Sequence, residues 1–357
     1  MNSTSRENWM IYGAYGYTGE LLAREAVQQG LKPILAGRNS QRVEALAREL
    51  GLDWRAFSLE DTTALAEGLA GIKVVVHCAG PFSATAEPMM QACLDSGVHY
   101  CDITGEVDVF LRAASLDAQA RAAGVVLCPG VGFDVIPTDC VAARLAEALP
   151  DASELDLGFD SRSPFSPGTA KTSVEGLKLG NRVRRDGQVV SIGLGALQRR
   201  IDFGDGVKHA AAIPWGDVAT AWHTTSIPDI TVYIPMSPRK AKQLKRLNWL
   251  RPVLGLGPVQ RFLKKKIEAR VSGPDQALRE KCPTYVWGEA RNGSGKRVEA
   301  RVQTANGYDV TVHGSLMAVR HLLEGAESAG FVTPSRLLGA DAVERLPGSG
   351  MIELKYS

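Results

Sequence analysis

Three glycines near the start of the chain follow a short apolar run and precede a run of good helix formers. Gly13, Gly16 and Gly19 lie in the sequence MIYGAYGYTGELL, with helix formers from Glu20 onward. Amides at the start of a helix point at the space above such a turn, and the helix dipole favours a phosphate there. Gly13 then permits the tight turn, Gly16 lets a pyrophosphate approach the backbone, and Gly19 lets the helix pack on the sheet.

The spacing of this motif is G-x-x-G-x-x-G, whereas the more familiar dinucleotide motif is G-x-G-x-x-G. A lone glycine triplet could also be an ordinary turn between a strand and a helix. The order of strand, glycines and helix nevertheless favours a dinucleotide site.

The second apolar run indicates which dinucleotide is bound. A site for NAD places Asp or Glu at the end of this strand, about 20 residues beyond the glycines, to bind the ribose 2′-hydroxyl. Here the run ends in LAGRNS, and Arg38 stands nineteen positions after Gly19. A guanidinium can hold a 2′-phosphate through charge-assisted hydrogen bonds. NADP(H) is therefore the predicted cofactor, and the alternative is that Arg38 is a solvated surface arginine.

Further cofactor contacts are expected in the loops that follow the strands, because ligands bind beyond the carboxyl ends of such strands. Asp61 could contact the adenine or cap the helix that begins at Thr62. In HCAGPF, the residues before Phe82 should lie beside the ribose and nicotinamide, and Phe82 could cover the cofactor or fill the core. The predicted cofactor residues are Gly13, Tyr15, Gly16, Tyr17, Thr18, Gly19, Gly37, Arg38, Asn39, Asp61, Ala79, Gly80, Pro81 and Phe82.

Candidate catalytic residues follow two later strands. Asp102 and Glu106 could form a polar wall of a substrate pocket, or they could cap helices. Asp134 could contact substrate, whereas Asp139 is expected to cap a helix that starts near Pro137. His77 lies inside a buried strand pattern and is expected to be a core histidine.

A loop rich in Pro, Ser and Gly, Ser161–Leu177, is well suited to line a pocket. Lys171 or Thr172 in this loop could orient an acyl carbonyl or supply a proton, or the loop could be an ordinary linker. No nucleophile, base and acid set is recognisable, and no metal site is expected. The catalytic residues are therefore unassigned, with Asp102, Glu106, Asp134 and Lys171 as the candidates.

The elements that must position these residues alternate between short apolar runs and amphipathic stretches up to about Leu149. Short runs without polar alternation are typical of strands buried on both sides, so a parallel sheet with helices on both faces is predicted. The expected strands are Met10–Tyr12, Ile34–Ala36, Ala56–Ser58, Val74–Cys78, Tyr100–Ile103 and Val125–Leu127, and the expected helices are Gly19–Gln29, Gln41–Leu50, Thr62–Leu69 and Glu87–Ser96.

After Pro150 the pattern changes to longer alternating stretches with hairpin signals, which predicts a mixed or antiparallel sheet. Turns are expected at Asp186-Gly187, at 204–206 and at 292–295. Helical spacing returns in Ser315–Gly330 and Ala340–Leu346. A second domain of mixed α and β structure is therefore expected.

One segment of the second domain is strongly basic. Residues 238–270 contain eleven Lys or Arg and one acidic residue, which gives +10 in a chain whose formal net charge is +2. Apolar residues are interleaved with the charges, so a basic amphipathic surface could dock an anionic membrane or an acidic carrier protein. The alternative is a solvated face whose Lys and Arg stems cover core residues.

Composition bounds the remaining function classes. The small net charge argues against nucleic acid as the main partner. The polar residues at 1–8 lack the apolar core of a signal peptide, and no apolar run approaches the length of a membrane span. Six cysteines without a C-x-x-C pair fit reduced thiols. A cytoplasmic location is expected, with peripheral contact at a membrane as the alternative that the basic segment allows.

Five motifs in order carry a resemblance to a known family. YGAYGYTGELL, LAGRN, HCAGPF, GVHYCDITGE and GVGFDVIPTD together resemble the saccharopine dehydrogenase-like oxidoreductases, particularly the branch with trans-acting enoyl reductases. The ending GFVTPSRLLGADAVERLPGSGMIEL is similar to the same branch. The resemblance implies a Rossmann domain at 1–150, a substrate domain of mixed α and β structure at 151–310, and a C-terminal segment, 311–357, that packs back on the Rossmann domain.

The motifs and the resemblance together predict an NADPH-dependent oxidoreductase. The expected reaction is hydride transfer to an unsaturated, hydrophobic acyl substrate, and a homodimer is plausible for such a reductase. One alternative is an imine-reducing or amino-acid dehydrogenase closer to saccharopine chemistry, which would need arginines to hold substrate carboxylates; Arg162 is the obvious candidate. Another is a membrane- or lipid-associated protein that binds the nucleotide without turnover.

Overall fold

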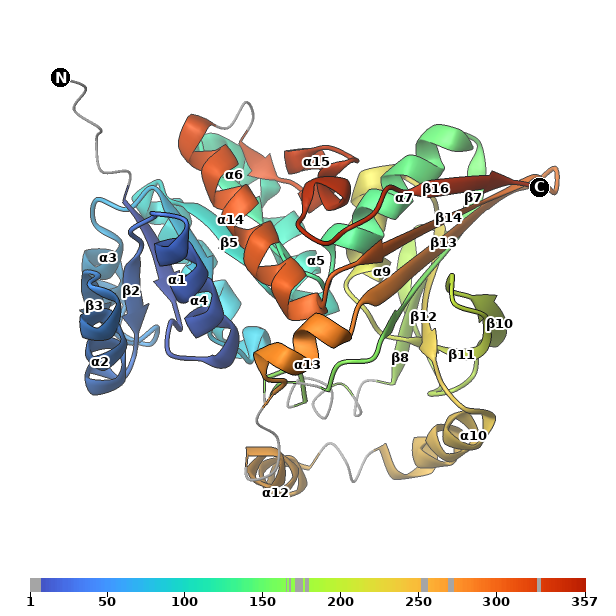
Figure 1. Cartoon of the computed structure of the whole chain (residues 1–357), viewed down its shortest axis with the longest axis horizontal. Helices are drawn as coiled ribbons and strands as arrows, with labels where there is room; N and C mark the ends of the chain where they lie inside the picture. Colours follow the sequence, from blue (N-terminus) through green and yellow to red (C-terminus); the bar gives the residue numbers. More distant parts are fainter. Residues whose placement is uncertain are drawn as a thin grey trace. The chain divides into compact units, whose positions relative to one another are not determined.

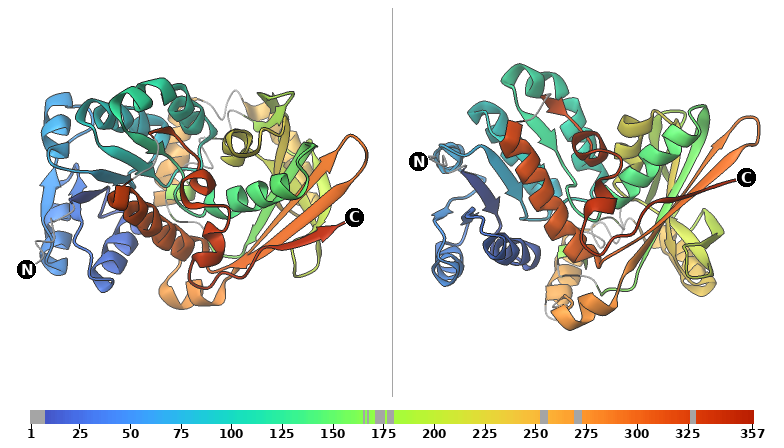
Figure 2. Two further views of the ribbon diagram at one scale, coloured as in Figure 1. Left: turned by 90° about the horizontal axis from the view of Figure 1, so that it is seen from above. Right: turned by 45° about the horizontal axis from the view of Figure 1, so that its top comes forward.

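A computed structural model gives the fold and describes residues 8–164, 166, 168–170, 176, 180–251, 256–268, 273–325 and 329–357. Contacts divide the chain into two compact units. Unit 1 comprises Met1–Phe133 and Thr311–Leu338, and unit 2 comprises Asp134–Val310 and Gly339–Ser357. Figure 1 labels the elements, and Figure 2 gives two further views.

Unit 1 contains a parallel sheet in the strand order β15-β6-β5-β4-β1-β2-β3. Val74, Val75 and Val76 in β4 are all fully buried, because helices cover both faces of the sheet (Figures 1 and 2). The predicted parallel sheet is therefore confirmed. Its strands are β1 Trp9–Tyr12, β2 Ile34–Gly37, β3 Trp54–Ala56, β4 Val74–His77, β5 His99–Asp102, β6 Val126–Cys128 and β15 Gly330–Phe331.

The helices of unit 1 mostly begin and end where local sequence signals place them. Asn39 and Asp61 cap helices with their side chains, and Gly51, Gly97 and Gly124 end helices in the left-handed conformation. One expectation needs correction, because α4 begins at Phe82 and not near Glu87. The helices are α1 Tyr17–Gln28, α2 Ser40–Leu50, α3 Thr62–Leu69, α4 Phe82–Ser96, α5 Val107–Ser115, α6 Asp117–Ala123, α14 Gly307–Gly325, which begins in unit 2, and α15 Pro334–Leu338.

Unit 2 is built on a mixed sheet in the order β10-β11-β12-β7-β13-β14-β16, with β8 pairing with β12 and β9. The β7–β12 pair is parallel and the other pairs are antiparallel. The three predicted turns connect β8 to β9, β10 to β11, and β13 to β14. The strands are β7 Ala152–Ser161, β8 Asn181–Arg185, β9 Gln188–Ile192, β10 Gln198–Asp202, β11 Val207–Ile213, β12 Asp229–Pro235, β13 Thr284–Asn292, β14 Arg297–Thr304 and β16 Glu353–Tyr356.

Helix α7 packs against β7, β13 and β14 on one face of this sheet, and α9 packs against α7 and β12. The contact is close at Gly288, where a Cβ atom would lie 2.6 Å from Val141 and 2.7 Å from Leu145 of α7. The helical elements of unit 2 are α7 Ile136–Ala148, α9 Asp217–Thr225, α10 Pro238–Leu247, η1 Asn248–Leu250, α12 Gly257–Glu268, α13 Gln276–Lys281 and η2 Ala342–Arg345.

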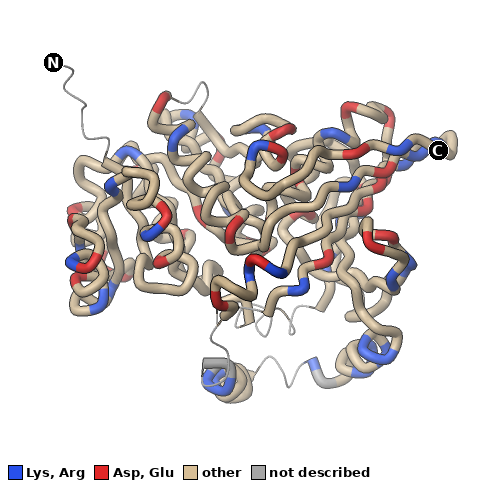
Figure 3. The backbone as a smooth tube through the Cα atoms, in the orientation of Figure 1, with Lys and Arg blue, Asp and Glu red and all other residues tan. Residues whose placement is uncertain are grey.

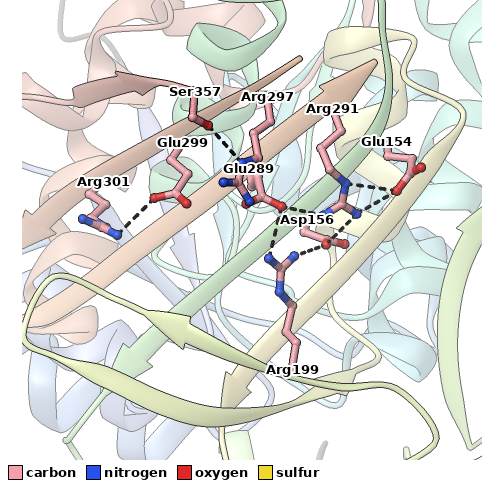
Figure 4. A network of polar contacts seen from close by, with 9 residues as sticks. All are labelled: Glu154, Asp156, Arg199, Glu289, Arg291, Arg297, Glu299, Arg301 and Ser357. Carbon is pink, nitrogen blue, oxygen red and sulfur yellow. Dashed lines mark hydrogen bonds and ion pairs between the residues drawn. The ribbon is translucent and has the colours of Figure 1, made fainter. Parts of the chain in front are cut away.

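The opposite face of the sheet carries a network of charged side chains (Figure 4). Asp156, Glu289 and Glu299 are cross-strand neighbours on β7, β13 and β14. Arg199 pairs with Asp156 and with Glu289, and Arg291 lies 2.5 Å from Glu289 and 3.2 Å from Asp156. Glu289 is only 1% exposed, so these arginines compensate a buried charge.

The division into units differs from the expected domain boundaries. Residues 134–150 belong to unit 2, because α7 packs on the mixed sheet. Thr311–Leu338 returns to unit 1, as expected, and adds β15 beside β6. Gly339–Ser357 belongs to unit 2, because β16 pairs with β14. The segment Ala340–Leu346 contains the short 3-10 helix η2.

Candidate cofactor site

The glycine turn joins β1 to α1 and packs closely on its neighbours. Gly13 has a φ of +84°, and a Cβ there would lie 2.8 Å from the backbone nitrogen of Ala79. A Cβ on Gly19 would lie 2.4 Å from the carbonyl oxygen of Gly13, so a larger residue would push α1 away from the turn. Gly16 is different, since a Cβ there would meet only the Gly13 oxygen, at 3.2 Å, among the described atoms beyond its chain neighbours. The space above Gly16 is therefore open, as an approaching pyrophosphate requires.

The start of α1 lacks a side-chain cap. Gly16 is its N-cap residue and has no side chain to accept from the first amides, whereas Asn39 and Asp61 cap α2 and α3. Tyr17 and Thr18 form the first turn of α1. Uncapped amides at a helix start favour an anion, so the first turn of α1 fits a phosphate group.

Arg38 and Arg42 lie at the corner where β2 ends and α2 begins. Arg38 is exposed, and neither guanidinium forms an ion pair within the described part of the chain. The Arg42 guanidinium lies over the Tyr15 ring, 4.6 Å from its centroid, and donates to the Tyr15 carbonyl oxygen at 3.3 Å. Arg42, which lies in the first turn of α2, was not among the predicted cofactor residues. An unpaired basic corner of this kind fits a 2′-phosphate.

Tyr15 is positioned by the same corner. A Cβ on Gly37 would lie 2.6 Å from the Tyr15 ring, so glycine there lets the ring lie across the end of β2. The Tyr15 hydroxyl accepts a hydrogen bond from the backbone N–H of Asn39 at 3.2 Å. The Asn39 and Asp61 side chains accept from the backbone amides of Arg42 and Ala64. For Asp61 the capping alternative is thus what the structure shows, and adenine contact stays a prediction.

The segment from Ala79 to Phe82 is held by neighbours from two elements. The Glu106 carboxylate accepts from the backbone N–H groups of Phe82 at 3.0 Å and Ser83 at 2.8 Å. Glu106 is also the N-cap residue of α5, yet its side chain caps α4 instead. Because a carboxylate already occupies the start of α4, that helix does not offer these two amides to a phosphate. The Phe82 ring packs edge-on against His77, which supports the core-filling alternative.

His77 is fully buried and helps to fix the same segment. The Thr85 hydroxyl donates to the Ala79 carbonyl oxygen at 2.7 Å, so it accepts from His77 Nε2 at 3.0 Å. His77 Nδ1 is then a buried acceptor without a partner among the described residues. Burial lowers the pKa of His77 to about 3, so the ring is neutral. The expected core histidine is confirmed in position, with one ring nitrogen unsatisfied.

Asp102 is fully buried at the end of β5. Its Oδ1 accepts from the backbone amides of Thr104 at 3.0 Å and Gly130 at 2.8 Å, and its Oδ2 accepts from the Tyr100 hydroxyl at 2.6 Å. Burial raises the pKa of Asp102 to about 6, while these hydrogen bonds oppose the shift. The carboxyl joins β5 to the loop after β6, and contact with a substrate stays a prediction.

Asp134 and Asp139 belong to unit 2. The Asp134 carbonyl oxygen accepts from Trp215 Nε1 at 2.7 Å. Asp139 does not cap α7, because its carboxylate accepts from the Thr224 hydroxyl on α9 at 2.5 Å. Fully buried Asp217 on α9 escaped prediction, and burial raises its pKa well above the ordinary value, with Asp139 adding to the effect. The Asp139 carboxylate therefore joins α7 to α9.

The remaining candidates from the sequence lie in the loop Ser161–Leu177 of unit 2. Lys171 and Thr172 lie outside the described residues. The described part of the chain contains no cluster of His, Cys, Asp and Glu that could hold a metal ion, and none of its helices is long and apolar enough to cross a membrane. A cavity of about 360 Å³ in unit 2 is lined by Lys208, His209, Pro235, Met236, Ser237 and Lys240.

Unit 1 thus has the strand order and the glycine turn of a dinucleotide-binding Rossmann domain. Residues 9–128 match the family model of the saccharopine dehydrogenase NADP binding domain. This match confirms the predicted family resemblance and the prediction of NADP(H) as the cofactor.

Curated relatives carry related names. A putative trans-acting enoyl reductase of Mycobacterium tuberculosis is 34% identical over 192 residues, which cover 49% of this chain and 45% of the relative. A probable mitochondrial saccharopine dehydrogenase-like oxidoreductase of Arabidopsis thaliana is 28% identical over 210 residues, which cover 50% of this chain and 45% of the relative. The chain therefore matches less than half the length of these relatives.

A solved structure shares the fold of the whole chain. The saccharopine dehydrogenase (L-Glu forming) of Saccharomyces cerevisiae is 12% identical, with a TM-score of 0.67 over 98% of this chain and 100% of the yeast chain. At this identity the likeness establishes the fold alone. The predicted α/β architecture, with a Rossmann-type domain and a mixed-sheet domain, is confirmed.

Proposed function

We propose that the protein is an NADPH-dependent oxidoreductase that reduces an unsaturated, hydrophobic acyl substrate. The observation that carries the cofactor choice is the corner formed by Arg38 and Arg42. It has no ion pair with any described residue, and it lies in the part of the chain that matches the NADP binding domain model. The acyl substrate is supported by relatives named as trans-acting enoyl reductases. A cytoplasmic location is part of the proposal, since all six cysteines are free thiols.

The residues of unit 1 have separable roles in this proposal. NADPH, when bound, supplies the hydride. The turn from Gly13 to Gly19 and the start of α1 would hold its pyrophosphate, and Arg38 and Arg42 would hold its 2′-phosphate. The segment that begins at Ala79 would border the nicotinamide, fixed by Glu106. These groups bind and orient, which is most of what hydride transfer requires of a protein.

An imine-reducing dehydrogenase is the alternative enzyme. It would need arginines with spare hydrogen-bonding capacity to bind substrate carboxylates. Arg162, the candidate from the sequence, pairs with Asp205 and lies over the Tyr285 ring at 5.3 Å from its centroid. Because this guanidinium already has partners in unit 2, the acyl substrate is favoured.

The first experiment is a fluorescence titration with NADPH and NADH. Wild type should prefer NADPH. Removing one charge-assisted contact costs about 1.5–3 kcal/mol, so Arg38→Ala and Arg42→Ala should each weaken NADPH binding by about tenfold or more and leave NADH binding nearly unchanged. Arg48→Ala is the matched control, because Arg48 lies on α2 like Arg42 and its side chain is 78% exposed. Equal binding of both nucleotides by wild type would refute the cofactor assignment.

The second experiment tests the reaction. NADPH oxidation is followed with 2-enoyl thioesters of increasing chain length, and in parallel with an amino acid plus an aldehyde acid. Turnover of the thioesters alone supports the proposal, and turnover of the second mixture alone supports the imine alternative. Tight NADPH binding without any turnover would favour a nucleotide-binding protein that is not an enzyme.

A further inference from the structure

The basic segment of unit 2 exposes large apolar side chains between positive charges. Trp249 is 91% exposed, Phe262 is 67% exposed and Leu256 is 54% exposed. These residues accompany α10, η1 and α12, which lie at the lower edge of Figure 1, and Figure 3 shows Lys and Arg gathered on the helices. We call Arg239–Arg251 and Leu256–Lys266 the basic surface. Isolated exposed apolar residues are ordinary, but aromatic rings this exposed within a basic segment call for an occupant.

The position of Trp249 follows from an anchored turn. Asn248 Oδ1 accepts from the backbone N–H of Leu194 at 2.9 Å, and Asn248 Nδ2 donates to the Leu194 carbonyl oxygen at 3.1 Å. Both contacts hold η1 on the loop after β9, so the indole projects outward from a fixed backbone. Lys245 and Arg246, one turn earlier, are exposed as well. Trp249 therefore lies on a fixed turn beside basic side chains.

Helix α12 repeats this arrangement. Val259, Gln260 and Leu263 lie on its covered side, with Gln260 only 9% exposed. Phe262, Lys265 and Lys266 are exposed, and their spacing of three and four residues places them on one helix face. Neither Lys265 nor Lys266 forms an ion pair within the described residues. An aromatic ring between cations thus occurs on both helical parts of the basic surface.

We propose that the basic surface docks unit 2 on an anionic lipid bilayer. Exposed Lys and Arg complement acidic headgroups, and Trp and Phe rings insert at the level of the headgroups. The charge supports this occupant, because residues 238–270 carry +10 while the rest of the chain carries −8. A bilayer can also accept separate protruding rings without a groove of matching shape. An acidic protein partner would have to supply such a groove.

The test is flotation of the full chain with phosphatidylcholine vesicles, with or without phosphatidylglycerol, and without nucleotide. Wild type should float only with the anionic vesicles, and added salt should weaken this binding. Each basic residue near an anionic surface contributes about fivefold, so Lys265→Gln with Lys266→Gln should weaken binding about 30-fold. Lys32→Gln with Lys296→Gln removes the same charge at exposed lysines outside the basic surface and should change little.

A second measurement tests insertion of the indole. Lipids with brominated chains should quench the tryptophan fluorescence of wild type, and Trp249→Phe should remove most of the quenched signal. Failure to float with anionic vesicles overturns the proposal, as does equal flotation with neutral vesicles or equal loss in the control variant. Binding to an acidic acyl carrier protein without binding to vesicles would assign the surface to a protein partner instead. None of these results depends on NADPH, so they stand apart from the proposed reaction.

Discussion

Asp102→Asn tests whether the buried carboxyl at the end of β5 makes unit 1 sensitive to pH. Asp102 Oδ1 accepts from two backbone amides and Oδ2 accepts from the Tyr100 hydroxyl. An asparagine in the same position keeps both amide contacts with Oδ1, and its Nδ2 donates to the Tyr100 oxygen once that hydroxyl turns. The substitution is therefore isosteric and keeps every hydrogen bond, while it removes the titration.

The expected magnitude follows from the pKa. Burial raises the pKa of Asp102 from 3.8 to about 6, so between these values the native chain keeps a proton that the unfolded chain has lost. Its contribution to stability is complete below about pH 4 and is lost as the pH rises through about 6. At about 1.4 kcal/mol per pKa unit, the wild-type chain loses about 3 kcal/mol between pH 4 and pH 8 through this group.

The assay is guanidinium unfolding of both chains at pH 4.5, 6 and 8, followed by circular dichroism and tryptophan fluorescence. Relative to the wild type, the variant should gain about 2 kcal/mol of unfolding free energy between pH 4.5 and pH 8, because about 1 kcal/mol of the total is already lost below pH 4.5. At pH 8 the two chains should differ in the unfolding transition of unit 1, because Asp102 lies in that unit. A constant difference across this pH range would refute the reasoning, because it would mean that the pKa of Asp102 is the same in the folded and the unfolded chain.

Two further substitutions test the contacts around the cofactor site. Gly19→Ala places a Cβ 2.4 Å from the Gly13 oxygen, so it should displace α1 and weaken NADPH binding at least tenfold in a titration. Gly30→Ala is the control. Its Cβ meets no atom within 4 Å, but Gly30 has a positive φ, so the substitution should lower stability while NADPH binding persists. Glu106→Gln turns one acceptor of the α4 amides into a donor and should cost about 1–3 kcal/mol in unfolding free energy, with a higher KM for NADPH. An unchanged KM for Glu106→Gln would show that the Ala79–Phe82 segment does not border the cofactor.

Most strands of unit 1 could be predicted because they are short apolar runs with no polar alternation. Strand β3 lies two residues before the expected Ala56–Ser58, and β15 was not expected. Val74–His77 is fully buried along its length, and that pattern is typical of a strand covered on both faces. The start of α4 could not be found in the same way. Pro88 suits the first turn of a helix and suggests a start near Glu87, but the first amides of α4 are satisfied by Glu106, which is 24 residues away from Phe82.

The parts of the cofactor site whose residues lie at fixed distances along the sequence could be predicted. The glycine turn and Arg38 have fixed spacings from the strands that they follow, so they stand out in the printed sequence. Arg42 does not, since its role depends on the Tyr15 ring lying across Gly37, a contact between residues 22 positions apart. The sequence leaves the roles of Asp102 and Glu106 open for the same reason, because their partners are set by packing.

The charged face of the mixed sheet shows why register matters more than composition in unit 2. The alternation of polar and apolar residues in β7 and β13 predicts a strand with one solvated face, yet Asp156 is only 7% exposed there and Glu289 only 1%. Pairing places these acidic residues opposite each other, which is unfavourable alone. Arg199 reaches both from β10, so the arrangement is stabilised only when β10 and β13 are correctly placed. A slip of β10 by one residue would turn Arg199 to the other face, away from Asp156 and Glu289, and the network therefore disfavours that alternative register.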